Sequence, residues 1–200
     1  MAGFAEIVSY LSGVDSSLTL AINSLHCPAS DFVWKTFSQV SVWIPLYLAV
    51  ALFIFRRLGW KRGLVSLCTL ILTVVACDQI ANLVKDSVCR LRPCHDEYMI
   101  QNGLRLLEKA GGKYGFYSGH AANAMGFAVA TSKLFRIDKK HRYSMYTVLI
   151  SLWALLLGAS RIFVGKHFFG DVLTGFAAGS LTAWITASVA VWCCGKFIRQ

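Results

Sequence analysis

Long apolar stretches separated by short polar connections make up most of this sequence. Five stretches have about the length that a helix needs to cross a bilayer, which is roughly 17 to 25 residues. They cover residues 39–56, 63–84, 119–135, 143–160 and 172–194. The short connections at 57–62 and 136–142 favour antiparallel neighbours. This pattern predicts an all-α protein, a polytopic transmembrane helix bundle of five spans that forms one domain over residues 36–200.

The first 35 residues form a separate segment, because acidic residues interrupt their apolar pattern. Apolar residues recur there at helical spacing on both sides of Gly13: Phe4, Ile7, Val8 and Leu11, then Leu18, Ala21, Ile22 and Leu25. This spacing predicts amphipathic helices that break at Gly13 and lie in the membrane interface. A sixth short or re-entrant span is the competing interpretation. A signal peptide is not expected, since no basic segment precedes a continuous apolar core.

Composition supports a membrane protein, because 56% of the residues are hydrophobic, 15% are charged and the mean hydropathy is +0.56. The net charge of +10 would suit either nucleic acid or anionic lipid as a partner. The distribution of the charge decides between these two partners. Eleven basic residues lie on one side of the predicted bundle, where Asp138 is the single acid. They are Arg56, Arg57, Lys61, Arg62, Lys133, Arg136, Lys139, Lys140, Arg142, Lys196 and Arg199. By the positive-inside rule that side is cytoplasmic. The N-terminus and the second and fourth connections then face outward, and no nucleic-acid partner is expected.

A polar stripe ends the second apolar stretch on the outward side. Asp78, Asn82, Lys85 and Cys89 are spaced by four, three and four residues, which places them on one helix face. For Asp78 we favour a structural ion pair with Lys85. Beyond Lys85, Pro93 disfavours helical geometry at Arg92 and should turn its guanidinium off the helix axis. The two cations then converge outside the membrane, although snorkelling at the interface would also explain them.

Two further outward segments carry candidate chemistry. The third stretch opens on Ser118, Gly119 and His120, where free backbone N–H groups at a helix start can bind an anion. Ser118 would equally serve as an ordinary N-cap. The fourth connection holds Ser160, Arg161, His167 and Asp171. The last two are four residues apart, so the carboxylate can orient one ring nitrogen and leave the other as a nucleophile or base; capping by Asp171 fits the same geometry.

The outward loop over residues 93–117 is the longest connection, and a short helix is predicted over residues 96–110. No metal is expected at the two histidines and Asp171, because three neighbouring cations would repel a divalent ion and attract phosphate instead. The cysteines lack metal-ligand spacing. Cys27, Cys89 and Cys94 would face the oxidising side, where a disulfide among them is compatible with the sequence but is not assigned by it.

Together, the segments K-x6-RP at 85–93, SGH at 118–120 and SR-x5-H-x3-D at 160–171 resemble the three signature motifs of the type 2 phosphatidic acid phosphatase superfamily. The resemblance spans about residues 36–194. It implies a helical membrane bundle and a metal-independent hydrolysis through a phosphohistidine, with no cofactor. Tyr117 departs from the family pattern, which usually has proline before the serine. A tyrosine loses the stiff turn and keeps a backbone N–H.

The resemblance also implies a role for each matching residue. His167 would be the nucleophile, Asp171 would orient it, and His120 would act as general acid and base. Lys85, Arg92, Arg161, Ser118 and Gly119 would bind the phosphoryl group. The implied function is an integral membrane lipid phosphatase.

Several substrates and two other functions stay open at this point. The candidate substrates are undecaprenyl pyrophosphate, phosphatidylglycerophosphate, phosphatidic acid and lipid A. The short loops resemble bacterial members, which suggests the inner membrane with the site facing the periplasm. The alternatives are a lipid phosphotransferase that uses the same phosphohistidine, and a non-catalytic protein that binds anionic lipid.

Overall fold

The computed structural model describes residues 2–197, so Arg199 of the predicted basic side lies outside the described residues. The helices are α1 (Ala2–Asn23), α2 (Pro28–Ser38), η1 (Val40–Trp43), α3 (Ile44–Val88), η2 (Pro93–His95), α4 (Glu97–Gln101), α5 (Gly119–Leu134), η3 (Phe135–Ile137), α6 (Ser144–Phe163) and α7 (Phe169–Phe197). Within the described residues, extended pairing is limited to one bridge between Leu91 and Tyr114. The predicted all-helical class is confirmed.

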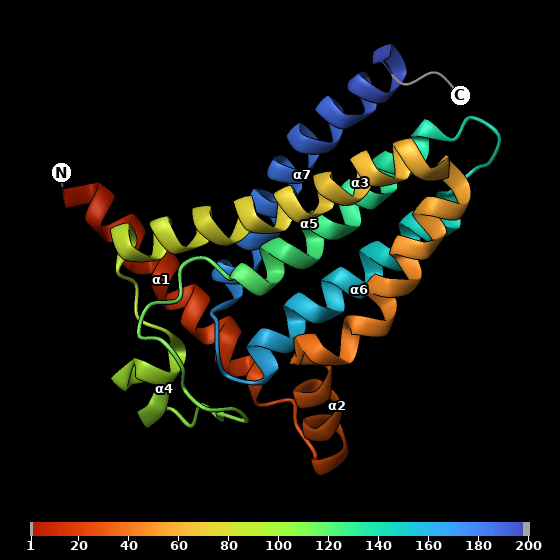
Figure 1. The fold of residues 1–200 in the computed structure, drawn as a ribbon. Coiled ribbons are helices and arrows are strands. Elements are labelled where there is room, and N and C mark those ends of the chain that lie inside the picture. The colour runs from red at the N-terminus through yellow and green to blue at the C-terminus, as the bar shows by residue number, and fades with distance from the viewer. Residues whose placement is uncertain (1, 198–200) are drawn as a thin grey trace.

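Helix α3 contains two of the predicted spans, because the chain reverses within it at Gly59. That glycine has φ 75° and ψ 175°, a conformation that a side chain at this position would strain. Figure 1 shows the two halves of α3 as the arms of a hairpin, with the second arm running back beside α5. The reversal brings the C-terminal end of α3 to the same end of the bundle as the start of α5.

Helix α5 lies at the centre of the bundle and packs against α3, α6 and α7 (Figure 1). Its contact with α7 depends on two glycines of the sequence GxxxG. A Cβ at Gly179 would lie 2.1 Å from the backbone oxygen of Ala122, and one at Gly175 would lie 2.6 Å from that of Ser118. Only glycine therefore permits this backbone approach. The two glycines serve packing inside the molecule, and they fix the start of α5 against the start of α7.

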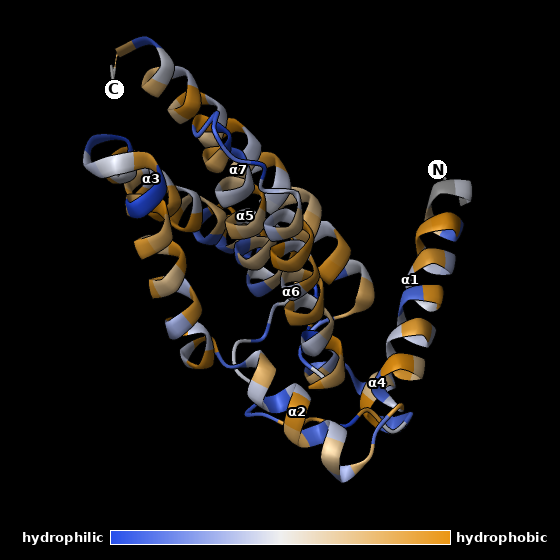
Figure 2. Ribbon diagram, turned by 90° about the vertical axis from the view of Figure 1, so that its right-hand side faces the viewer, coloured by the Kyte–Doolittle hydropathy of each residue, from blue (hydrophilic) through white to orange (hydrophobic). Residues whose placement is uncertain are grey.

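Three helical stretches of the described residues are long and apolar enough to cross a membrane: Val40–Val88, Ser144–Phe163 and Phe169–Phe197. Apolar residues colour much of these helices in Figure 2, and several large apolar side chains on α3, α6 and α7 are exposed, as lipid contact requires. The predicted stretch 119–135 corresponds to α5, which has 16 residues and is not among the three. The count of five spans, with six as the alternative, stays a prediction.

The N-terminal helix differs from the prediction at Gly13, since α1 is continuous from Ala2 to Asn23. The predicted break there is wrong, because Gly13 keeps helical geometry in the middle of α1. Large apolar side chains such as Ile7 and Leu11 stay exposed on α1. The C-terminal end of α1 is anchored by Asn23, whose amide donates to the backbone oxygens of Ile162 and Phe163. The interfacial position of residues 1–35 stays a prediction.

The outward loop contains less helix than predicted. Within residues 96–110, α4 covers Glu97–Gln101 only, and the remainder is irregular. Tertiary contacts hold this irregular part, because the side chain of Asn23 bonds both the N–H and the carbonyl oxygen of Arg105. Cys27, Cys89 and Cys94 are all free thiols in the structure. The structure therefore contains no disulfide among these three cysteines.

Candidate active site

The cations of the first motif follow the end of α3. Cys89 adopts a left-handed conformation with φ 52°, which ends the helix and turns the chain outward. The bridge between Leu91 and Tyr114 then fixes the next residues, and the Nε of Arg92 donates to the backbone oxygen of Tyr114 at 3.0 Å. Burial lowers the pKa of Arg92 from its usual value. A cation held in this partly desolvated position attracts an anion more strongly than one in bulk water.

The predicted ion pair between Asp78 and Lys85 is wrong. The Nζ of Lys85 donates to Oδ1 of Asn82 at 3.3 Å, and Oδ1 of Asp78 accepts from the amide of Asn123 at 2.7 Å. Seven residues of helix correspond to about 10 Å of rise, so each side chain bonds a nearer amide group instead. Lys85 stays available to the site, because its Nζ would lie 3.6 Å from a Cβ on Gly119.

Ser118 and Gly119 lie at the start of α5, but only Gly119 faces the cavity. The side chain of Ser118 is fully buried, its Oγ caps the helix by accepting from the N–H of Ala121, and its own N–H donates to the backbone oxygen of Asp171. Tyr117 is buried beside it against Cys77, Ala81 and Ala122. Gly119 instead lines the cavity described below. The helix start therefore presents Gly119, rather than Ser118, to a ligand.

Arg161 is almost completely buried near the end of α6, at 3% exposure. Its Nη1 lies 3.6 Å from Oε2 of Glu108 in the outward loop and donates to Ser38 at the end of α2. Its Nε has no hydrogen-bond partner among the described residues. A buried donor without an acceptor costs about 1–3 kcal/mol, so this guanidinium marks a place where an acceptor belongs.

The third motif places His167, in the turn before α7, against Asp171 in the first turn of that helix. Nδ1 of the imidazole lies 3.4 Å from Oδ2 of the carboxylate, without the geometry of a hydrogen bond. Burial lowers the pKa of His167 to about 4, although the carboxylate of Asp171 acts in the opposite direction. The ring is therefore neutral at pH 7, as a nitrogen nucleophile must be.

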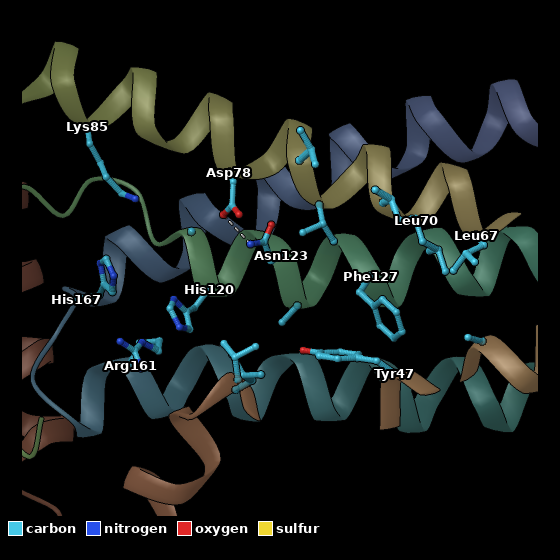
Figure 3. A pocket seen from close by; sticks show the side chains of 18 of the residues that line it. Tyr47, Leu67, Leu70, Asp78, Lys85, His120, Asn123, Phe127, Arg161 and His167 are labelled. Atoms are coloured by element: carbon cyan, nitrogen blue, oxygen red, sulfur yellow. Dashed lines mark hydrogen bonds between the residues drawn. The ribbon is translucent and has the colours of Figure 1, made fainter. Parts of the chain in front are cut away.

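One cavity of about 660 Å³ joins these segments, which are far apart in the sequence. Of the eight residues predicted for the site, six line it: Lys85, Arg92, Gly119, His120, Arg161 and His167. Figure 3 shows the side chains of Lys85, His120, Arg161 and His167 directed toward the same end of this cavity. The other two predicted residues, Ser118 and Asp171, are buried behind it. Two imidazoles and three cations thus surround a space that suits a phosphoryl group.

The sequence did not single out the residues that hold Asp171. Arg90 lies between the two motif cations, and its guanidinium donates to Oδ1 of Asp171 at 2.9 Å and to Oδ2 of Asp15 at 2.6 Å. Asp15 belongs to α1 and also accepts from the N–H of Gly170 at 2.7 Å. The sequence signal that could have indicated Asp15 is an acidic residue inside an otherwise largely apolar helical segment. Through these contacts α1 joins the site.

A membrane-embedded lipid phosphatase is the class of protein that this bundle and this site define. A family model described as the PAP2 superfamily matches residues 63–193, and the chain belongs to that superfamily. A lipid A 4′-phosphatase of Bacteroides thetaiotaomicron is 31% identical over 92% of this chain and 80% of its own length. A lipid A 4′-phosphatase of Porphyromonas gingivalis is 29% identical, over 96% of this chain and 79% of its own length.

Two solved structures share the fold. A transmembrane PAP2-type phosphatidylglycerolphosphate phosphatase from Bacillus subtilis superposes with a TM-score of 0.73 at 20% identity, covering 95% of this chain and 90% of its own. Aquifex aeolicus LpxE superposes with a TM-score of 0.61 at 23% identity, covering 86% of this chain and 93% of its own. At these identities the likeness concerns the arrangement of the helices.

Proposed function

We propose that this phosphatase hydrolyses lipid phosphate esters through a phosphohistidine. The Nε2 of His167 attacks phosphorus and forms the P–N bond, while the P–O bond to the lipid breaks and its electron pair stays on the lipid oxygen. His120 donates a proton to that oxygen. Water then attacks phosphorus and gives a proton to His120, the P–N bond breaks, and phosphate leaves.

The observation that carries the proposal is the convergence of the two imidazoles with an unpaired buried donor in one cavity. The Nε of Arg161, together with Lys85 and Arg92, offers hydrogen bonds and positive charge where a phosphoryl group gains negative charge during transfer. The N-terminal end of α5 at Gly119 adds its dipole to the same place. The short approach of Asp171 to His167 supports an orienting role for the carboxylate.

Relatives guide the choice of substrate and location. Two relatives are named as lipid A 4′-phosphatases, and a more distant one as phosphatidylglycerophosphatase B. Lipid A is therefore the first substrate to test, ahead of phosphatidylglycerophosphate, phosphatidic acid and undecaprenyl pyrophosphate. We place the protein in a bacterial inner membrane with the site facing the periplasm, residues 36–200 as the catalytic domain and residues 1–35 as the interfacial segment. This orientation follows from the basic residues at the opposite end.

A phosphate-release assay in detergent, with EDTA present throughout, tests the proposal on these four lipids. We expect release without added metal and the highest kcat/KM on lipid A. The variant His167→Ala should lose at least about 10³-fold in kcat, because it lacks the nucleophile. The matched control is His26→Ala, since His26 is exposed and does not line the cavity.

The same assay separates the other two functions. A phosphotransferase would pass the phosphoryl group to an added acceptor alcohol, so phosphorylated alcohol would appear at the expense of free phosphate. A non-catalytic lipid-binding protein would release nothing. Full turnover by His167→Ala would rule out the phosphohistidine, and complete loss of activity in EDTA would rule out metal-independent hydrolysis.

A further inference from the structure

The cavity continues beyond the phosphate-binding end into the apolar interior of the bundle. Figure 3 shows Tyr47, Leu67, Leu70 and Phe127 around this second end, on the two arms of α3 and on α5. Such a lining suits the hydrocarbon part of a lipid whose phosphate lies among the cations. Substrate atoms between the phosphate and the chains would then occupy the middle of the cavity.

Asp78 and Asn123 lie in that middle section (Figure 3). The amide nitrogen of Asn123 donates to Oδ1 of Asp78 at 2.7 Å, which leaves the amide oxygen of Asn123 as a buried acceptor without a partner. The opposite orientation of the amide would place two acceptors against each other. The second carboxylate oxygen of Asp78 also accepts no hydrogen bond from the described residues.

Two carboxylates with buried side chains elsewhere in the protein have both oxygens bonded. On the opposite side of the bundle, Asp138 accepts from the N–H of Lys140 on one oxygen and contacts the ring of His141 on the other. Asp171 is likewise bonded on both oxygens. Asp78 is more exposed than these two carboxylates and lines the cavity beside Asn123, whose amide oxygen is buried without a partner. Ionisable groups at such a depth are costly and usually face a functional cavity.

Free acceptors need a hydrogen-bond donor from the ligand. Asn123 lies one helical turn, about 5 Å, after His120. Oδ1 of Asp78 would lie 3.8 Å from a Cβ on Gly119, so both acceptors lie within about 5–10 Å of the phosphate-binding end. A lipid with a hydroxyl or an amide N–H at about that distance from phosphorus would satisfy them. A polyprenyl phosphate has no such donor, because its chain beyond the phosphate is hydrocarbon.

We infer that Asp78 and Asn123 form a substrate-specificity site that binds a hydroxyl or amide N–H close to the phosphate. The site selects lipid phosphates that carry such a donor, such as acylated amino sugars or a glycerophosphate headgroup with a free hydroxyl, over polyprenyl and diacylglycerol phosphates, which carry none. This inference rests on the proposed function and narrows its substrate class. Asp78 and Asn123 bind the substrate and take no part in the transfer of the phosphoryl group.

A matched pair of synthetic lipid phosphates tests the inference. Both carry the same chains and one phosphate, but one has an amide N–H about 5–10 Å from phosphorus and the other has that nitrogen methylated. We expect the wild-type protein to favour the N–H lipid about tenfold in kcat/KM. Asn123→Ala and Asp78→Ala should each lower kcat/KM on the N–H lipid toward that of the methylated lipid, and leave turnover of the methylated lipid unchanged.

The control variant is Asn102→Ala, because Asn102 is exposed at the end of α4, away from the cavity. Equal losses on both lipids in the two test variants would show a structural role and overturn the inference. Equal turnover of both lipids by the wild-type protein would overturn it too, while leaving the proposed function intact. If the wild-type protein hydrolysed neither synthetic lipid and no lipid of the panel, both this inference and the proposed function would be overturned.

Discussion

His167 is 2% exposed, and its burial has a consequence for stability as well as for chemistry. In the unfolded chain a histidine has a pKa near 6.5, whereas burial lowers that of His167 to about 4 in the folded protein. Between these two values the unfolded state binds more protons than the folded state. The free energy of unfolding therefore falls as the pH is lowered from about 6.5 to about 4.

His167→Asn tests this dependence, because asparagine keeps a polar side chain of similar shape and does not titrate. We expect the wild-type protein to lose on the order of 2–3 kcal/mol more than the variant between pH 7 and pH 4, at about 1.4 kcal/mol per pKa unit. Thermal unfolding in detergent at a series of pH values measures the difference. His26→Asn, at an exposed position, should follow the wild-type curve. Parallel curves for His167→Asn and the wild type would contradict the lowered pKa.

At the scale of elements, α1 reaches the site through charged contacts, although none of its described side chains lines the cavity. Asp15 pairs with Arg90, Arg90 pairs with Asp171, and Asp171 faces His167. The guanidinium also lies over the ring of Phe168, 4.0 Å from its centroid. Asp171 is completely buried, so its charge depends on Arg90 for compensation. Removing one member of such a chain leaves a buried charge unpaired and displaces its neighbours.

Asp15→Asn should therefore slow the reaction without preventing substrate binding. We expect kcat to fall about tenfold with KM within about twofold, because the change disturbs the orientation of His167 and leaves the phosphate-binding cations in place. Steady-state phosphate release on lipid A measures both constants. Glu6→Gln is the matched control, since Glu6 is an exposed acid on the same helix. An unchanged kcat, or a change confined to KM, would show that Asp15 merely attaches α1 to the bundle.

At the scale of the whole molecule, local patterns predicted the helices and the three motifs, because hydrophobic spacing and residue type are properties of short segments. Gly59 shows a limit of this reasoning. The local pattern did not predict that its backbone conformation would join two spans into one kinked helix. The continuous α1 shows the reverse, since the glycine at position 13 keeps helical geometry.

The contacts around the site depend on docking between distant segments, which no local pattern encodes. Glu108 reaches Arg161 from a loop that was predicted to be helical, and Asn123 replaces Lys85 as the partner of Asp78. Each pairing joins residues from different elements, so it follows from how the helices pack. Packing in turn depends on close approaches such as that of Gly179 to Ala122.

The orientation of the protein in the membrane is also a property of the whole molecule. The distribution of charged residues alone predicts it. The basic connections lie at one end and the phosphate-binding end of the cavity at the other, so the site should face outward. Cys27 provides a native probe of the outward side: it is exposed between α1 and α2, and hydrogen bonds from Ser30 lower the pKa of its thiol. A lowered pKa increases the reactive thiolate fraction.

A single-cysteine protein that keeps Cys27, with the other six cysteines replaced by alanine, should react with a membrane-impermeant maleimide in intact spheroplasts. A second protein without native cysteines that carries Lys139→Cys should react only after permeabilisation, because Lys139 is exposed in the basic connection at the opposite end. Phosphate release by both proteins checks that they are folded. Labelling of Lys139→Cys in intact spheroplasts, with Cys27 protected, would reverse the orientation and place the hydrolysis of lipid phosphates on the cytoplasmic side. Labelling of both without permeabilisation would mean that the two ends do not lie on opposite sides of the bilayer, which the predicted bundle of membrane-crossing helices requires.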